Sequence, residues 1–105
     1  MELLNKSIKI LEKVNAVNLK LFDFKGKSPF FDYFLIGTLT DRKSQAALSY
    51  FNSEFKNEIK NIEGRNNLGW VLIDLGDLII HLFGEEEREF YNFDEKFMEY
   101  QKDLP

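Results

Sequence analysis

Cysteine is absent from this chain of 105 residues, and histidine occurs only once, as His81. The absence of cysteine excludes a disulfide framework, a thiolate metal site and a cysteine nucleophile. One histidine also falls short of the roughly four nitrogen or sulfur ligands that a structural zinc site takes. We therefore expect neither a metal ion nor a cofactor.

Long apolar runs are missing as well. No stretch approaches the roughly 18 to 20 apolar residues that span a bilayer, and the first residues lack the regions of a secretory signal. Hydrophobic residues still make up 44% of the chain and aromatic residues 15%, which is enough apolar surface to offset chain entropy and excludes a wholly disordered protein. We expect one soluble cytoplasmic domain over residues 1–105, without membrane contact.

The net charge of -4 hides an uneven distribution along the chain. Residues 1–62 carry 10 Lys or Arg and 7 Asp or Glu, whereas residues 63–105 carry 4 and 11. An acidic surface repels phosphate, so direct nucleic-acid binding is disfavoured and a basic protein surface is the better partner. The alternative is that Glu85, Glu86, Glu87 and Glu89 only form a solvated helix start, where carboxylates favour the helix dipole.

Hydrophobic periodicity divides the first half of the chain into four elements. Residues 2–15 have the apolar spacing of an amphipathic helix, and residues 19–24 alternate as a half-buried strand does. Residues 31–38 are almost continuously apolar, which indicates a central strand covered on both faces. Thr40 or Asp41 then begins a second helix. Its expected buried stripe consists of Ala47, Phe51, Phe55 and Ile59, widened by Tyr50.

The second half begins with a short stretch at 62–65, which precedes a polar turn through Asn66, Asn67 and Gly69. Residues 70–73 and 78–83 are apolar runs joined by turn-forming residues, which predicts a β-hairpin. The last segment has a helical stripe, with a break near Asn92. The stripe consists of Phe90, Phe93, Phe97, Tyr100 and Leu104. The order α-β-β-α-β-β-β-α predicts an α/β fold of the α+β kind, with a mixed sheet of about five strands covered by helices.

Few residues have a spacing that points to catalysis. Asp32, Asp74 and Asp77 could hold a magnesium ion beside a nucleotide, although aspartates in a tight turn are also explained by local hydrogen bonds. Residues 26–28 resemble a phosphate-binding loop but lack its first glycine, so they fail that motif. On the expected strand 78–83, His81 shares one face with Ile79 and Phe83. This placement is more typical of a structural or contact residue than of a catalyst.

Trp70 and Tyr91 are candidates for a contact surface. Large aromatic side chains dominate protein interfaces, and they do so beside charged rims such as the acidic second half of this chain. Plain core packing is the alternative in a chain that contains 11 phenylalanines.

Several segments together resemble a known family. The most specific is the block from Trp70 to Phe83, followed eight residues later by Tyr91, whose tryptophan, aspartates, glycine and histidine stand in the family's order and spacing. The other segments are 26–36, 38–43, 63–64 and 86–91. Over roughly residues 19–97 the chain resembles the ribosomal silencing factor family, also called Iojap-like.

The resemblance implies a domain with nucleotidyltransferase-like topology that lacks nucleotidyltransferase chemistry, and hence a protein that is not an enzyme. It also implies binding to the fourteenth-numbered protein of the large ribosomal subunit, which blocks joining of the small subunit and represses translation when nutrients are limiting. The implied contact residues are Trp70, Asp74, Leu75, Gly76, His81, Arg88 and Tyr91. A homodimer of the free protein stays open, and so does a magnesium-dependent nucleotide enzyme that uses the three aspartates.

The chain departs from the family pattern at four positions. Leu39 stands where the family usually has glycine, which predicts a backbone that is not left-handed there. Phe93, Asp94 and Phe97 stand where the family prefers leucine, glutamate and tryptophan, which are conservative changes.

Overall fold

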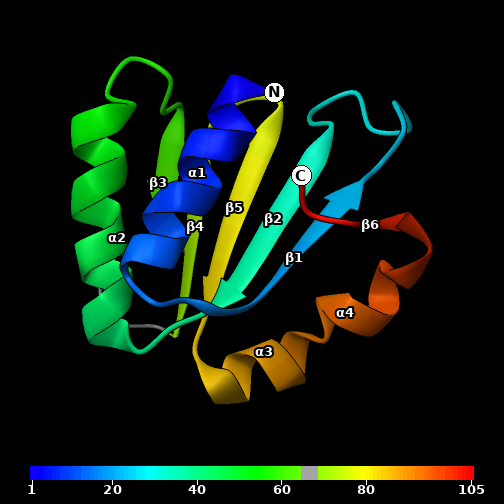
Figure 1. Cartoon of the computed structure of the whole chain (residues 1–105). Helices are drawn as coiled ribbons and strands as arrows, with labels where there is room; N and C mark the ends of the chain where they lie inside the picture. Colours follow the sequence, from blue (N-terminus) through cyan, green and yellow to red (C-terminus); the bar gives the residue numbers. More distant parts are fainter. Residues whose placement is uncertain (65–68) are drawn as a thin grey trace.

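Six strands form one mixed sheet in the computed structural model, which describes residues 1–64 and 69–105 (Figure 1). The elements are α1 (Glu2–Lys13), β1 (Val17–Asp23), β2 (Tyr33–Thr38), α2 (Asp41–Glu54), β3 (Asn61–Glu63), β4 (Trp70–Asp74), β5 (Leu78–Phe83), α3 (Glu85–Tyr91), α4 (Phe93–Lys96), the 3-10 helix η1 (Met98–Tyr100) and β6 (Gln101–Lys102). The strand order is β3-β4-β5-β2-β1-β6. This mixed sheet with helical covers confirms the predicted fold class.

β2 is a central strand, as its continuous apolarity predicts. It pairs in parallel with β5 and antiparallel with β1, and Leu35 and Ile36 on opposite faces are both fully buried. Every other strand pair is antiparallel among the described residues. The carboxyl ends of β2 and β5 therefore meet at one end of the sheet, where α2 and α3 begin.

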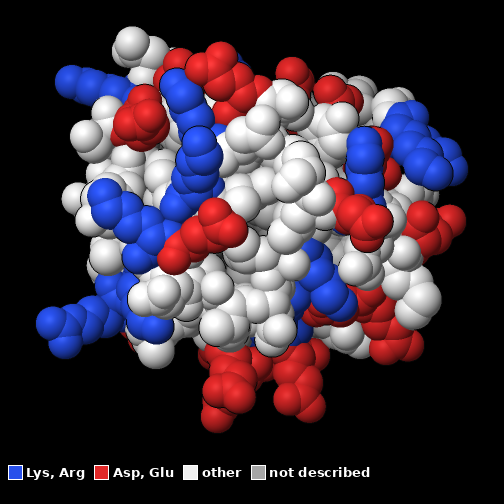
Figure 2. All heavy atoms as spheres, in the orientation of Figure 1, with Lys and Arg blue, Asp and Glu red and all other residues white. Residues whose placement is uncertain are grey.

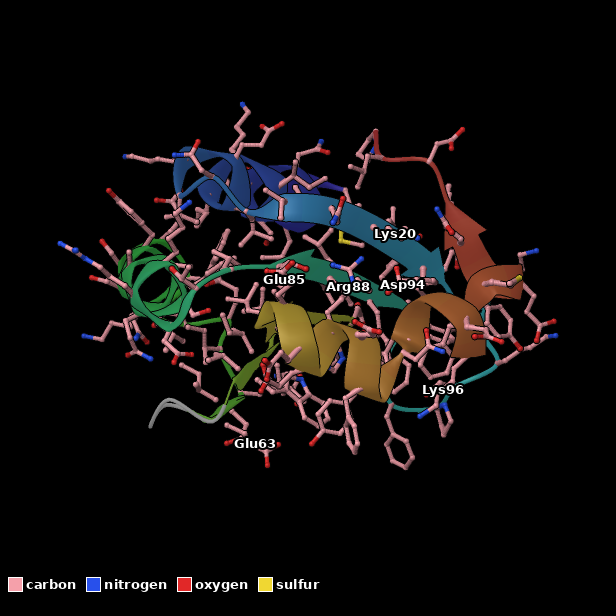
Figure 3. All side chains as sticks on the ribbon, turned by 90° about the horizontal axis from the view of Figure 1, so that it is seen from below. Lys20, Glu63, Glu85, Arg88, Asp94 and Lys96 are labelled. Atoms are coloured by element: carbon pink, nitrogen blue, oxygen red, sulfur yellow. The ribbon has the colours of Figure 1, made fainter. Side chains whose placement is uncertain are left out.

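The two faces of the sheet carry different cores. α1 and α2 pack on one face over aliphatic side chains, whereas α3, α4 and η1 lie on the other face over aromatic ones, and Figure 3 shows α1 and the α3–α4 segment on opposite sides of the sheet. β5 serves both cores. Leu78, Ile80 and Leu82 face the aliphatic core beneath α1 and α2. Ile79, His81 and Phe83 face the aromatic core on the other side, as the two-residue period of a strand predicts.

The second helix begins where predicted but ends earlier than its apolar stripe. The Thr40 hydroxyl accepts a hydrogen bond from the Lys43 N–H at 3.3 Å, which is the expected N-cap. α2 ends at Glu54, because Phe55 leaves the helical conformation at φ -124° and ψ 34°. Ile59 therefore lies beyond the helix. None of the described helices is long and apolar enough to cross a membrane.

Leu39, at the entry to this helix, has an ordinary negative φ, as predicted from the loss of the family's glycine. Its side chain is buried, and its N–H donates to the Phe83 carbonyl oxygen at 2.9 Å. The turn thus connects the ends of β2 and β5.

The C-terminal helical stripe is broken at Asn92, as predicted, but only some of its residues are buried. Asn92 has a left-handed φ of 53°, so α3 ends there and α4 begins in a new direction. The later residues of the stripe still pack on the aromatic core, namely Phe93, Phe97 and Tyr100. Phe90 and Leu104 are exposed instead. The two-residue strand β6, which the sequence did not predict, pairs with β1.

Candidate functional site

The β4–β5 hairpin is closed by a tight turn, as predicted. The Asp74 carboxylate accepts the Gly76 N–H at 2.8 Å, and the Leu75 N–H donates to the Leu78 carbonyl oxygen at 2.9 Å. Gly76 has a φ of +90°, which favours glycine. Local turn geometry thus accounts for Asp74.

Trp70 lies at the other end of this hairpin, beside α3. It pairs across the ladder with Phe83, and their rings are stacked with centroids 5.3 Å apart. The Tyr91 ring at the end of α3 lies 4.4 Å from the Trp70 ring. Both Trp70 and Tyr91 remain partly exposed, so the structure brings the two predicted aromatic anchors together at the surface.

A hollow of about 270 Å³ opens beside these two rings. It is lined by Trp70, Tyr91, Leu72, Gly64 and Glu63; we call it the aromatic groove. Its floor is apolar, and the exposed Glu63 places a carboxylate at its margin, where Figure 3 shows this side chain outside the sheet. Such a groove suits a side chain that is apolar along its stem and positively charged at its tip.

Gly64 is needed to form the groove. Its φ is +81°, and a Cβ at this position would overlap the backbone carbonyl oxygen of Trp70. Any other residue would therefore push β3 away from β4.

Phe90 extends the aromatic surface outward. It is 79% exposed, and its ring centroid lies 5.1 Å from that of Tyr91. Phe90 was expected on a buried helical stripe, so sequence reasoning missed it as a surface residue. Its adjacency to Tyr91 was the available signal, since neighbouring residues on a helix point about 100° apart and seldom share one face.

His81 lies beneath Trp70 and is only 3% exposed. Its Nδ1 accepts the Trp70 indole N–H at 3.1 Å. Aromatic rings surround the imidazole, and this burial lowers the pKa of His81 to about 3. His81 is therefore neutral at physiological pH and cannot touch a partner directly in this conformation.

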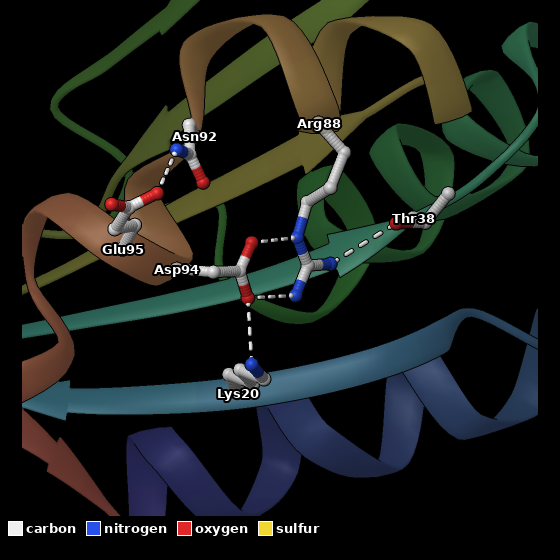
Figure 4. A network of polar contacts seen from close by, with 6 residues as sticks. All are labelled: Lys20, Thr38, Arg88, Asn92, Asp94 and Glu95. Atoms are coloured by element: carbon white, nitrogen blue, oxygen red, sulfur yellow. Dashed lines mark hydrogen bonds and ion pairs between the residues drawn. The ribbon is translucent and has the colours of Figure 1, made fainter.

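Arg88 is also directed inward, into a polar network between α3 and the sheet (Figure 4). Its guanidinium donates to both Asp94 carboxylate oxygens, at 2.8 and 2.9 Å, and to the Thr38 hydroxyl at 3.0 Å. Lys20 adds an ion pair to Asp94 at 2.9 Å. Figure 3 shows Lys20, Arg88 and Asp94 close together between β1 and the α3–α4 segment. Hydrogen bonding from Arg88 holds the pKa of Asp94 well below its usual range.

Acidic side chains gather around α3, at the end of the molecule where the groove lies. Glu85, Glu86 and Glu89 are exposed on this helix. Figure 2 shows acidic groups projecting at the α3 end of the molecule, while most basic groups on that face lie over α1 and α2. The uneven charge of the sequence is thus an uneven charge in space, which favours a basic partner at the α3 end.

The other predicted contact residues lie apart from the groove. Asp74 and Gly76 form the hairpin turn at the far end of β4, and about 13 Å of extended strand separates Trp70 from Asp74. Leu75 is buried in the aliphatic core beneath α1 and α2, on the opposite face of the sheet. The structure therefore does not bring these three residues together with Trp70.

The three aspartates of the enzymatic alternative do not form a metal site. The Asp32 N–H donates to the Asp77 carbonyl oxygen at 2.8 Å, so their backbones are neighbours. Across residues 1–64 and 69–105, however, no three His, Asp or Glu side chains are arranged to hold a metal ion. Asp32 and Asp77 precede the parallel strands β2 and β5, and Asp74 ends the antiparallel strand β4 at the same edge, whereas ligands of open α/β sheets bind beyond the carboxyl ends of the parallel strands.

A hollow of about 510 Å³ does lie beyond those carboxyl ends. Among its lining residues are Asp41, Glu85 and Glu87, and Lys43 supplies a positive charge. A lining with three carboxylates and one lysine repels a triphosphate.

The fold defines a small α+β protein, and its aromatic groove presents partly exposed aromatic side chains beside a carboxylate. The chain belongs to the ribosomal silencing factor family, because a family model described as "Ribosomal silencing factor during starvation" matches residues 1–104. The resemblance found in the sequence is thereby confirmed.

Relatives and solved structures agree with this assignment. A protein of Halalkalibacterium halodurans named "Ribosomal silencing factor RsfS" is 34% identical over 89% of this chain and 83% of its own length. The protein of the same name from Bacillus subtilis is 34% identical over 75% of this chain and 70% of its own. A crystal structure of a Bacillus halodurans protein, 33% identical, superposes with a TM-score of 0.80 over 98% of both chains.

A more distant relative carries a different name. The mouse protein "Mitochondrial assembly of ribosomal large subunit protein 1" is 26% identical over 83% of this chain and 41% of its own length. A crystal structure from Chromobacterium violaceum, 21% identical, has the same fold, with a TM-score of 0.82 over 99% of this chain and 88% of that one.

Proposed function

We propose that this protein is a non-enzymatic translation repressor of the cytoplasm that silences ribosomes when nutrients are limiting. It binds the large ribosomal subunit at the fourteenth-numbered protein and sterically blocks association with the small subunit. Membership of the ribosomal silencing factor family supports this proposal. The name of the mouse relative, which refers to the large ribosomal subunit, supports the choice of subunit.

The observation that carries the proposal is the aromatic groove with its acidic margin. Trp70 and Tyr91 offer rigid aromatic area beside Leu72, and Glu63 and the α3 glutamates add negative charge. Interfaces concentrate their binding energy in such aromatic residues. Ribosomal proteins tend to present basic surfaces, so the acidic margin attracts them and speeds their encounter.

The expected contact residues divide into three groups by their accessibility and place in the fold. Trp70 and Tyr91, joined by Phe90, are accessible and contact the partner, while Asp74 and Gly76 at the hairpin turn form a separate contact region. The remaining members are turned inward: His81 supports the groove from beneath Trp70, Arg88 anchors α3 to Asp94, and Leu75 packs in the core on the opposite face.

The test compares two exposed phenylalanines that differ in location. Phe90 on α3 is 79% exposed and Phe30 in the β1–β2 loop is 82% exposed, so neither Phe90→Ala nor Phe30→Ala removes core packing. Phe90→Ala should weaken binding to large subunits about tenfold, the effect of losing a contact worth somewhat over 1 kcal/mol. Phe30→Ala should bind as the wild type does. Equal binding by all three proteins would refute the assignment of the groove.

A further inference from the structure

His81 is buried, yet it makes a polar contact with the residue that leads the proposed interface. We propose that His81 is a positioning residue: its Nδ1 holds the indole N–H of Trp70 and thereby fixes the tryptophan ring against Tyr91. This inference rests on the proposed function only for its effect on binding. The orientation of Trp70 in the free protein is a separate property and can be tested separately.

Strand register places the two side chains within reach. Trp70 on β4 is directly opposite Phe83 on β5, and His81 stands two residues before Phe83 on the same face. Diagonal neighbours of this kind are about 7 to 8 Å apart at their backbones, which long aromatic side chains can span. The resulting hydrogen bond, from Trp70 Nε1 to His81 Nδ1, measures 3.1 Å.

The hydrogen bond also determines the protonation of the imidazole. Because Nδ1 accepts the hydrogen bond from the indole N–H, the ring proton of neutral His81 must sit on Nε2. Nε2 is buried and has no hydrogen-bond partner among the residues that the structure describes. The rings of Phe34, Phe83 and Phe93 surround the imidazole, with centroids 4.4, 6.0 and 5.0 Å away.

This unpaired N–H argues that packing alone does not explain a histidine here. A phenylalanine would fill an aromatic pocket of this kind without burying an unpaired donor, which is unfavourable. What a phenylalanine cannot supply is an acceptor for the indole. The hydrogen bond to Trp70 is therefore the property that distinguishes histidine from an apolar ring at position 81.

Loss of the acceptor should change the tryptophan and leave the fold in place. Without Nδ1, the indole N–H must either stay unpaired against aromatic rings or turn toward water. Turning moves the ring away from Tyr91 and changes the shape of the aromatic groove, since Trp70 forms part of its lining.

The first measurement uses the free protein. Trp70 is the only tryptophan, so the indole N–H gives a single nitrogen-correlated NMR signal. In uniformly 15N-labelled wild type we expect a scalar coupling across the hydrogen bond between Trp70 Nε1 and His81 Nδ1, together with an unprotonated Nδ1. In His81→Phe the coupling disappears and the indole proton exchanges faster with water.

The second measurement is the affinity for large ribosomal subunits. His81→Phe should bind about tenfold more weakly, the effect of losing one hydrogen bond that orients a main contact. His81→Asn offers an amide oxygen at the position of Nδ1 and should recover part of the affinity. Ile79→Val is the matched control, because Ile79 lies on the same strand and in the same core without a ring or hydrogen-bond contact to Trp70; it should bind as the wild type does.

The outcomes separate this inference from the proposed function. An indole signal that is the same in wild type and His81→Phe overturns the inference, whatever the ribosome binding. Normal binding by His81→Phe, in a series where Phe90→Ala binds weakly, overturns it as well. If the wild type itself does not bind large subunits, the proposed function fails, and the positioning of Trp70 is still decided by the coupling in the free protein.

Discussion

Acid should destabilise this protein through one buried group, His81. In the unfolded chain a histidine titrates near pH 6.5, whereas burial lowers the pKa of folded His81 to about 3. Between these values the unfolded chain binds a proton that the folded chain excludes, so lowering the pH favours unfolding. Stability that depends on neutral His81 is complete above about pH 7.5 and is lost progressively below pH 6.5.

The size of the effect follows from the width of this window. Each pH unit below the unfolded pKa costs about 1.36 kcal/mol, so acidification from pH 7.5 to 5.5 should lower the free energy of unfolding by about 1.4 kcal/mol. Folded His81 stays neutral throughout this range. With a typical urea dependence of about 1 to 3 kcal/mol per molar, the unfolding midpoint should fall by roughly 0.5 to 1.4 M.

The assay is urea unfolding of wild type and His81→Phe at pH 7.5 and 5.5, followed by far-ultraviolet circular dichroism. The lower pH stays above the isoelectric point, which lies near 5.0. Groups common to both proteins cancel in the comparison, so the wild type should lose about 1.4 kcal/mol more than the variant. The same loss in both proteins would show that His81 is protonated in the folded state and would refute its burial as a neutral acceptor.

Three further predictions concern other parts of the molecule. Arg88→Ala should lower the free energy of unfolding, measured with urea, by about 1.5 to 3 kcal/mol, because it removes the paired hydrogen bonds to Asp94. Arg88→Lys should recover only part of this loss. Because the pKa of Asp94 is lowered in the folded protein, the contribution of this pair to stability should fade as the pH drops below about 4. Gly64→Ala should lower the melting temperature more than Gly26→Ala, since both glycines have positive φ but only Gly64 faces a backbone atom where a Cβ would stand, and equal shifts in calorimetry would contradict that contact. Titration calorimetry with ATP, GTP, CTP and UTP plus magnesium should give no binding heat at millimolar ligand, and a saturable heat would revive the enzymatic alternative that uses Asp32, Asp74 and Asp77.

Strict periodicity made most of the sheet predictable. The alternation of β5 fixes which of its side chains face each core, and the turn residues between β4 and β5 identify the hairpin. The end of α2 was not predictable, because the apolar spacing continues through Phe55 to Ile59 without a glycine or proline to mark a stop. β6 has only two residues, which is too few to show an alternation of apolar and polar side chains.

The candidate site was predictable in its residue types more than in its orientations. Aromatic character and acidic surroundings singled out Trp70 and Tyr91 as contact candidates, and only the structure shows that their rings lie 4.4 Å apart. A motif does not reveal whether a side chain points inward, so the resemblance implied contact roles for His81 and Arg88, although His81 is buried and Arg88 is directed toward Asp94 inside the molecule. Phe90 was assigned to the buried face because its spacing of three from Phe93 was counted across the break at Asn92, where α3 ends and α4 begins in a new direction.

The most direct test of the central claim is co-sedimentation of the purified protein with isolated large and small ribosomal subunits of Bacillus subtilis, followed by addition of small subunits to the loaded large ones. Silencing by occlusion predicts retention on the large subunit alone and fewer joined ribosomes than in a control without the protein. Retention on neither subunit at micromolar protein and moderate salt, or undiminished joining with the protein bound, would contradict the account.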